Sequence, residues 1–161
     1  MTWESHRDIE RLMFRYARCV DLAEWDELGR LFTHAQVRAS TSDDVRRGAE
    51  GVAALWASVN KVHADGTLRT RHLLTNVIID IDEDAGRAVG ESYFMVFQAT
   101  DRVPLQPIAG GRYTDRFVRI DGTWWFEEKY IQVDQVGNMS DHLTVDLADG
   151  PISFEDLPSP S

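Results

Sequence analysis

The spacing of apolar residues divides the chain into an N-terminal part with helical periodicity and a C-terminal part with strand periodicity. Apolar residues recur every three to four positions in three segments, which predict helices over 5–20, about 23–32 and about 48–62. Residues 36–40 alternate and predict a short strand, and the polar residues 41–44 predict a loop after it.

From residue 70 onwards apolar and polar positions alternate, which predicts strands over 70–80, 87–99, 112–120 and 123–134. Helices followed by consecutive strands are the order of an α+β domain, and hairpin connections make most of its sheet antiparallel. Asp121-Gly122 indicates a tight hairpin turn, and Gly110-Gly111 indicates a bulge where the sheet bends. We therefore expect a curved sheet that wraps as a cone around the N-terminal helices and leaves a cavity between them.

The strand over 70–80 carries a histidine within an otherwise apolar pattern. Strand alternation places His72, Leu74, Asn76 and Ile78 on one face, and the opposite face is also largely apolar. Two apolar faces predict a central strand rather than an edge strand. An imidazole at this position lies either at a cavity wall or in the core, bonded to a backbone carbonyl.

The first predicted helix ends close to a carboxylate. Ser5 and Asp8 resemble a capping box at its start, and Tyr16 lies on its inward face. Asp21 follows at the C-terminal end, where the helix dipole disfavours a negative charge. Two interpretations stay open: Asp21 is the N-cap of the second helix, or it serves the cavity.

Composition and charge limit the possible partners. The chain has 161 residues, of which 43% are hydrophobic and 27% are charged, and no apolar run is long enough for a membrane helix. Its formal net charge of −10 repels nucleic acids and anionic membranes. The single cysteine, Cys19, and the lack of an apolar leader predict a cytoplasmic protein. We expect a small-molecule ligand or another copy of the chain as partner.

The predicted domain covers residues 1–136, and residues 137–161 form an acidic tail with three prolines whose end we expect to be mobile. Leu143, Val145 and Leu147 alternate within this tail. They predict either a short additional strand or a segment that lies across a neighbouring subunit.

Several short segments within residues 5–135 carry a resemblance to a known family through their order and spacing: 16–21, 24–28 with 31–32, 68–72, 110–113 and 121–126. The sequence resembles the SnoaL-like members of the nuclear transport factor 2-like superfamily. Within it, the most similar branch contains scytalone dehydratase, bile acid 7α-dehydratase and hexachlorocyclohexane dehydrochlorinase. The resemblance implies a cone-shaped α+β barrel of the cystatin-like type, and a homo-oligomer, with a trimer favoured over a dimer.

The resemblance also implies site residues. Catalytic members carry an Asp-His pair, which by motif falls on Asp21 and His72, and the dehydratases have a tyrosine in the first helix that corresponds to Tyr16. Scytalone dehydratase has a second histidine on the following strand, and an ungapped count places Gln98 near that position. This departure puts the substrate or the leaving-group step in doubt.

Other residues are weaker candidates for the pocket. Asn76, Gln98, Arg112 and Trp56 are predicted to bind substrate, although each of these residue types also occurs in purely structural positions. The remaining histidines receive no role. His63, His72 and Asp65 do not match a known spacing of metal ligands, so we expect no metal and no cofactor.

The predicted chemistry is an elimination. A neutral imidazole held by Asp21 can take a proton from the carbon next to a carbonyl, and Tyr16 can donate a hydrogen bond to the enolate oxygen that forms. Returning the proton to a β-hydroxyl releases water, so we predict a dehydratase that acts on a hydrophobic, cyclic, oxygenated molecule. Two alternatives stay open: an isomerase or polyketide cyclase that uses the same pair, and a non-catalytic subunit like the small subunit of ring-hydroxylating dioxygenases.

Overall fold

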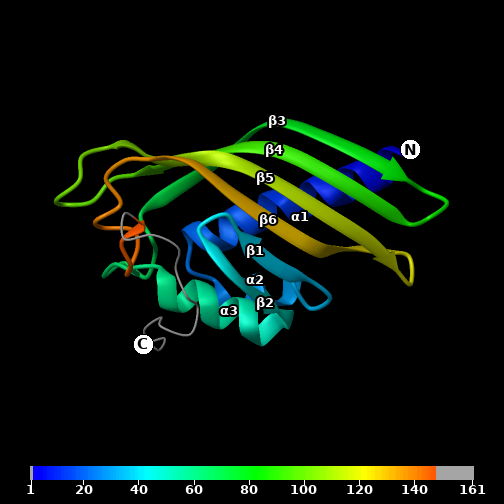
Figure 1. Cartoon of the computed structure of the whole chain (residues 1–161), viewed down its shortest axis with the longest axis horizontal. Coiled ribbons are helices and arrows are strands. Elements are labelled where there is room, and N and C mark those ends of the chain that lie inside the picture. Colours follow the sequence, from blue (N-terminus) through cyan, green and yellow to red (C-terminus); the bar gives the residue numbers. More distant parts are fainter. Residues whose placement is uncertain (1, 148–161) are drawn as a thin grey trace.

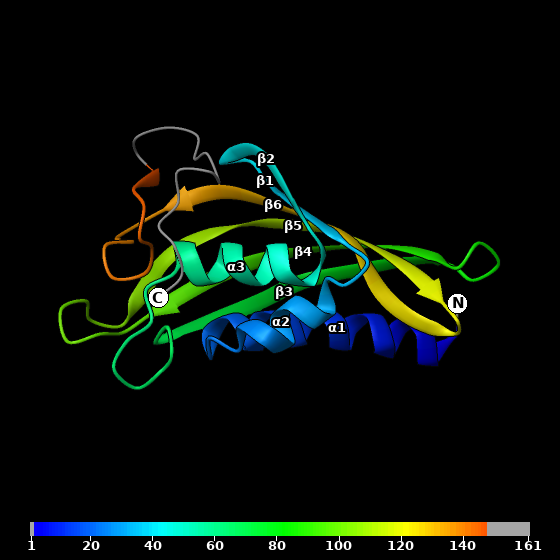
Figure 2. The same cartoon turned by 90° about the horizontal axis from the view of Figure 1, so that it is seen from below.

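The computed structural model describes residues 2–147, and within them three helices lie on the concave side of a six-stranded sheet (Figures 1 and 2). The helices are α1 (Trp3–Asp21), α2 (Trp25–Leu31) and α3 (Gly48–Val59). The strands are β1 (Gln36–Ala39), β2 (Ser42–Arg47), β3 (Thr70–Asp82), β4 (Arg87–Gln98), β5 (Gln106–Ile120) and β6 (Thr123–Val136). No helix in this range is long and apolar enough to cross a membrane.

The strands follow the order β2-β1-β6-β5-β4-β3, and the sheet is open. All neighbouring pairs are antiparallel except β1 with β6, which is parallel. The α+β class and the mostly antiparallel sheet are therefore confirmed. The sequence pattern predicted a loop over residues 41–44. Residues 42–47 instead form β2, because they pair with β1 in a hairpin.

Helix α1 begins earlier than the sequence suggested. Thr2 is its N-cap and accepts a hydrogen bond at Oγ1 from the backbone N–H of Ser5, at 3.1 Å. The predicted capping box at Ser5 is wrong, because Ser5 lies in the first turn and donates its hydroxyl to Glu83 at 3.2 Å. The inward side of α1 buries residues at helical spacing, including Ile9, Met13 and Tyr16, so its amphipathic character is confirmed.

Strand β3 is an edge strand, so the prediction of a central strand is wrong. Its pairing with β4 shifts between Thr75 and Ile78, and Asn76 there has a φ of 53°. This bulge reverses the alternation, so that Leu74 points inward before it and Val77 after it. The second apolar face of the strand is consequently in solvent, where Ile78 is 59% exposed.

Gly111 marks the predicted bulge in β5, where the pairing with β6 shifts. A Cβ atom at this position would lie 2.0 Å from the carbonyl oxygen of Gln132 and 2.9 Å from the ring of Phe94. Glycine lets the two backbones and this ring approach closely, and Phe94 then stacks on Tyr113 with 4.4 Å between ring centroids. The bend therefore shapes the aromatic wall of the cavity.

After β6 the chain turns back over the open end of the sheet. Thr144 donates its backbone N–H to Val59 at 2.9 Å, and Leu143 forms an isolated bridge with Asn60. Residues 143, 145 and 147 thus form no additional strand; they line a pocket of their own chain. The tail's predicted mobile end includes residues 148–161, which lie outside the described range.

Candidate active site

The carboxylate of Asp21 is held by donors from strand β3. Asp21 is the last residue of α1, and its side chain accepts hydrogen bonds from Nδ1 of His72 at 2.6 Å, from the backbone N–H of His72 at 3.0 Å and from the hydroxyl of Thr70 at 2.7 Å. It does not cap the second helix, because α2 begins at Trp25 after Glu24. The structure therefore decides between the two interpretations and places Asp21 beside His72.

The charge of Asp21 is stabilised in this position. Burial by itself raises the pKa of a carboxyl group, but the hydrogen bond from His72, the attraction to its ring and the hydrogen bond from Thr70 lower the pKa of Asp21 below its ordinary value. Asp21 is only 8% exposed. A buried carboxylate that stays ionised holds the neighbouring imidazole in one tautomer and stabilises its protonated form.

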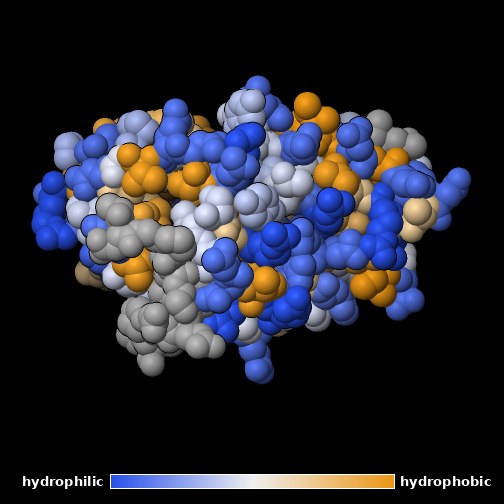
Figure 3. Space-filling model, in the orientation of Figure 1, coloured by the Kyte–Doolittle hydropathy of each residue, from blue (hydrophilic) through white to orange (hydrophobic). Residues whose placement is uncertain are grey.

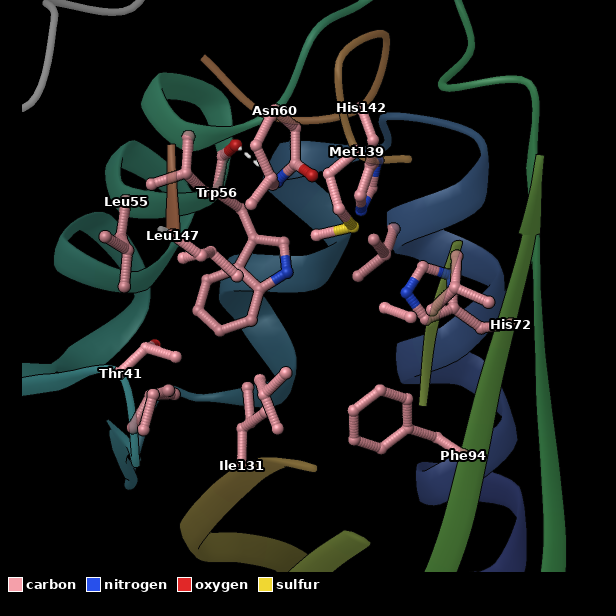
Figure 4. A pocket seen from close by; sticks show the side chains of 18 of the residues that line it. Thr41, Leu55, Trp56, Asn60, His72, Phe94, Ile131, Met139, His142 and Leu147 are labelled. Carbon is pink, nitrogen blue, oxygen red and sulfur yellow. Dashed lines mark hydrogen bonds between the residues drawn. The ribbon is translucent and has the colours of Figure 1, made fainter. Parts of the chain in front are cut away.

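His72 presents its other nitrogen to the cavity. Because Nδ1 donates to Asp21, Nε2 is the acceptor nitrogen, and Figure 4 shows the ring entering the pocket from the side of β3. The side chain of His72 is only 7% exposed. This arrangement is that of a general base held by a carboxylate.

Tyr16 lies in the same pocket within a group of aromatic rings. Its ring packs edge-on against Trp56 and Tyr113, with centroids 6.0 Å and 5.7 Å away. Burial raises the pKa of Tyr16 well above its ordinary value, and hydrogen bonds with Tyr113 and Trp56 only partly oppose this effect. The phenol therefore stays protonated and can donate a hydrogen bond to a developing oxyanion.

A buried ion pair supports the two tyrosines. Nζ of Lys129 contacts the two carboxylate oxygens of Asp115 at 3.0 Å and 3.2 Å, and both side chains are fully buried. The same ammonium lies 4.0 Å from the ring centroid of Tyr16 and 3.6 Å from that of Tyr113. This pair faces the rings rather than the pocket, so we assign it to their positioning.

The pocket between these residues is an apolar cavity of about 160 Å³. It is lined mainly by aliphatic and aromatic side chains from the helices and strands, with His72, His142, Asn60 and Thr41 among its polar residues (Figure 4). Residues 139–147 of the C-terminal segment cover one side of it. Among residues 2–147 no group of three or more His, Cys, Asp or Glu side chains is placed to hold a metal ion.

Comparison with known sequences assigns the fold to a family. Residues 1–129 match the sequence profile of the SnoaL-like domain. The chain belongs to the SnoaL-like domain family. A comparison of this SnoaL-like chain with curated proteins finds no significant match.

Solved structures similar to this SnoaL-like protein include three proteins from Novosphingobium aromaticivorans. An NTF2-like protein with a cystatin-like fold has a TM-score of 0.69 and 16% identity, with 84% of this chain and 85% of that chain covered. A candidate scytalone dehydratase has a TM-score of 0.64 and 22% identity, with 83% and 87% covered. The β subunit of a candidate aromatic-ring-hydroxylating dioxygenase has a TM-score of 0.64 and 18% identity, with 83% and 91% covered. These similarities show the shared NTF2-like fold.

The residues predicted to bind substrate lie in different places in the structure. Trp56 lines the pocket, and its contact with substrate stays a prediction. Gln98 is 1% exposed and is used elsewhere, because its amide donates to the carbonyl oxygens of Leu68 and Asp141, each at 3.0 Å. It therefore supports the loop at Asp141 instead of lining the pocket.

Two of these predictions are corrected by strand geometry. Asn76 lies in the bulge of β3, where it is exposed and outside the pocket. Arg112 points to the outer face of β5 and pairs with Asp134 at 2.9 Å. Strand alternation gives the neighbours Arg112 and Tyr113 opposite faces, and Tyr113 is the one that reaches the cavity.

Tyr113 and His142 are pocket residues that the sequence analysis missed. Tyr113 belongs to the segment 110–113 that carries the family resemblance, so the signal was present but was attributed to its neighbour. His142 had no such signal, because it follows the last strand by several residues in a segment without clear periodicity.

Proposed function

We propose that the protein is a cofactor-independent dehydratase that acts on a hydrophobic, cyclic, oxygenated small molecule. The observation that carries this proposal is the hydrogen bond of 2.6 Å between Asp21 and Nδ1 of His72, which leaves Nε2 of His72 facing an apolar pocket that also contains Tyr16. A base, its orienting carboxylate and an oxyanion donor are the groups that proton abstraction next to a carbonyl requires.

In the proposed reaction Nε2 of His72 takes the proton from the carbon α to a carbonyl. The electron pair of that C–H bond forms the enolate, whose oxygen accepts a hydrogen bond from Tyr16. When the enolate collapses, the bond to the β-hydroxyl breaks, and this oxygen takes the proton back from His72 and leaves as water. The product is an α,β-unsaturated carbonyl compound, and His72 returns to its neutral form. Because the same imidazole removes the α-proton and protonates the leaving oxygen from one side of the substrate, the elimination is syn.

The size of the pocket narrows the substrate class. An apolar protein cavity of about 150 Å³ holds a benzene molecule, and the cavity here measures about 160 Å³. A compound with one ring therefore fits the pocket as it stands. The predominance of apolar lining favours a substrate with few polar groups, placed to meet His72 and Tyr16.

The test is turnover of a panel of monocyclic β-hydroxy ketones, followed by the ultraviolet absorbance of the enone and by product mass. We expect His72→Ala and Asp21→Asn to lower kcat by about 10²–10⁴. Arg112→Gln is the matched control, because it changes a charged residue outside the pocket. Full activity in both site variants, with circular dichroism like that of the unchanged protein, would refute the assigned roles.

The product mass also separates the alternatives. Elimination lowers the mass by one water, whereas an isomerase or a cyclase that only moves a proton leaves it unchanged. The similarity to a dioxygenase β subunit suggests a non-catalytic assembly role as a further possibility. That role predicts a stable complex with a large iron-sulfur subunit and does not require Nε2 of His72.

We also propose that the protein is a homo-oligomer, a trimer rather than a dimer. Leu73, Ile78 and Tyr93 on the outer face of β3 and β4 are 45%, 59% and 54% exposed. Figure 3 shows apolar residues distributed between hydrophilic ones over this view of the molecule, so the contact would be mixed. Light scattering coupled to size-exclusion chromatography measures the mass directly, and a monomer at micromolar concentration would contradict this proposal.

A further inference from the structure

The loop that follows β6 is anchored at several points to the rest of the domain. The carboxylate of Asp141 accepts a hydrogen bond of 2.6 Å from the hydroxyl of Thr100 and pairs with Arg102. Its backbone carbonyl accepts hydrogen bonds from the side chains of Gln98 and His63, each at 3.0 Å. These contacts fix the backbone immediately before the next residue, His142.

The backbone of His142 is itself held on both sides. Its carbonyl oxygen accepts from the N–H of Lys61 at 2.8 Å, and its N–H donates to the carbonyl of Met139 at 2.9 Å. These hydrogen bonds fix the backbone of residue 142 at the edge of the pocket. The loop therefore holds His142 where its ring lines the cavity.

The ring of His142 lines the same pocket as the ring of His72. Figure 4 shows it beside Met139, while His72 enters from the side of β3. The two imidazole centroids are 6.3 Å apart, and His142 is only 5% exposed. Nδ1 of His142 is buried and has no hydrogen-bond partner within the described part of the chain.

A buried polar atom without a partner costs free energy, so its presence in a pocket calls for an explanation such as a catalytic role or a bound group. Oε1 of Gln98 is also buried without a partner, but that side chain does not line the pocket, whereas the ring of His142 does. We propose that His142 is a second histidine of the active site, which hydrogen-bonds through Nδ1 to an oxygen of the bound molecule. In this role His142 orients the substrate relative to His72.

The charge state of the ring suits this role. Burial lowers the pKa of His142 to about 3, and the nearby rings of His72 and His63 act in the same direction, while Asp21 opposes them. At neutral pH the imidazole is therefore uncharged, with one donor and one acceptor nitrogen. It can bind a hydroxyl or a carbonyl oxygen without placing a second positive charge beside His72.

The assignment of this oxygen to a substrate rests on the proposed function, but the contact can be tested without turnover. Phenol and toluene have nearly the same shape, and only phenol has an oxygen. We would measure their affinities by calorimetry for the unchanged protein and for His142→Phe, which keeps a ring of similar size. We expect the ratio of phenol to toluene affinity to fall by a factor of about 2–10 in the variant, the usual effect of one hydrogen bond. His34→Phe, the same substitution at an exposed position away from the pocket, serves as the control.

A second measurement identifies the histidine involved. In protein with ¹⁵N-labelled histidine, phenol should shift the Nδ1 signal of His142 and toluene should not. An unchanged affinity ratio, or shifts confined to His72, would overturn the proposal. If the unchanged protein shows no activity on the β-hydroxy ketone panel, the dehydratase assignment is refuted. The phenol contact of His142 does not depend on that result.

Discussion

The buried pair of Lys129 and Asp115 permits a prediction whose size follows from the structure. Both side chains are fully buried, and Asp115 accepts its hydrogen bonds from Lys129 at 3.0 Å and 3.2 Å. Burial raises the pKa of Asp115 and lowers the pKa of Lys129, and each charge opposes the shift of the other. Lys129→Met leaves a buried carboxyl group without its partner, which typically costs about 3–5 kcal/mol of unfolding free energy.

The reverse change should cost less. In Asp115→Asn the ammonium keeps its contacts with the rings of Tyr16 and Tyr113, whose centroids lie 4.0 Å and 3.6 Å away, and buried cation–π contacts contribute about 2 kcal/mol or more. The double variant Asp115→Leu with Lys129→Met buries no charge and should recover most of the loss.

Urea unfolding followed by tryptophan fluorescence measures these differences. A loss of less than about 1 kcal/mol for Lys129→Met, the value typical of an exposed pair, would refute this reasoning.

Four further predictions follow from single contacts. Tyr16→Phe should lower kcat by about 10–10³ while the melting temperature changes little, because one oxyanion donor is lost; a kcat that does not change would remove Tyr16 from the mechanism. Gly111→Ala should destabilise the protein, since the added Cβ would lie 2.0 Å from the oxygen of Gln132, and a melting temperature equal to that of the unchanged protein would contradict the bulge geometry. Hydrogen bonds from Thr2, Ser5 and Arg119 lower the pKa of Glu83 to about 2, so its contribution to stability is complete above an unfolded pKa of about 4.3 and is lost as the pH falls to 2; acid unfolding of Glu83→Gln should lack this component. The pKa of His142 is about 3 in the folded protein and about 6.5 in the unfolded chain, so between these pH values only the unfolded state binds a proton. The free energy of unfolding should therefore fall as the pH falls from 6.5 to 3, by up to about 1.4 kcal/mol per pH unit more than in His142→Phe.

The local sequence pattern was sufficient to predict the helices and strands, but not to predict which side chains of the strands face inward. The inward stripe of α1, the late strands and the hairpin at Asp121 follow from short-range periodicity, which depends only on neighbouring residues. The bulge at Asn76 depends on pairing with β4, and it exchanged the inward and outward positions of β3 beyond it. Arg112 was named as a pocket candidate with no prediction of the face it occupies, and the structure places Tyr113 at the cavity instead.

The candidate site likewise combines residues that the sequence pointed to with contacts that only the structure shows. The family resemblance named Asp21, His72 and Tyr16 as partners, and the structure brings Asp21 to 2.6 Å from His72 although 51 positions separate them. Sequence alone left the role of Asp21 between a helix cap and a catalytic partner, because both use a carboxylate at the same position.

The sequence by itself therefore determined the α+β class and the inward face of the first helix, since these follow from spacing, and the family resemblance pointed to Asp21 and His72 as a pair. Only the tertiary structure decided that β3 is an edge strand, that Gln98 holds a loop and that His142 enters the pocket. These facts depend on contacts between segments far apart in the chain, and no local pattern encodes which surface a returning loop will meet.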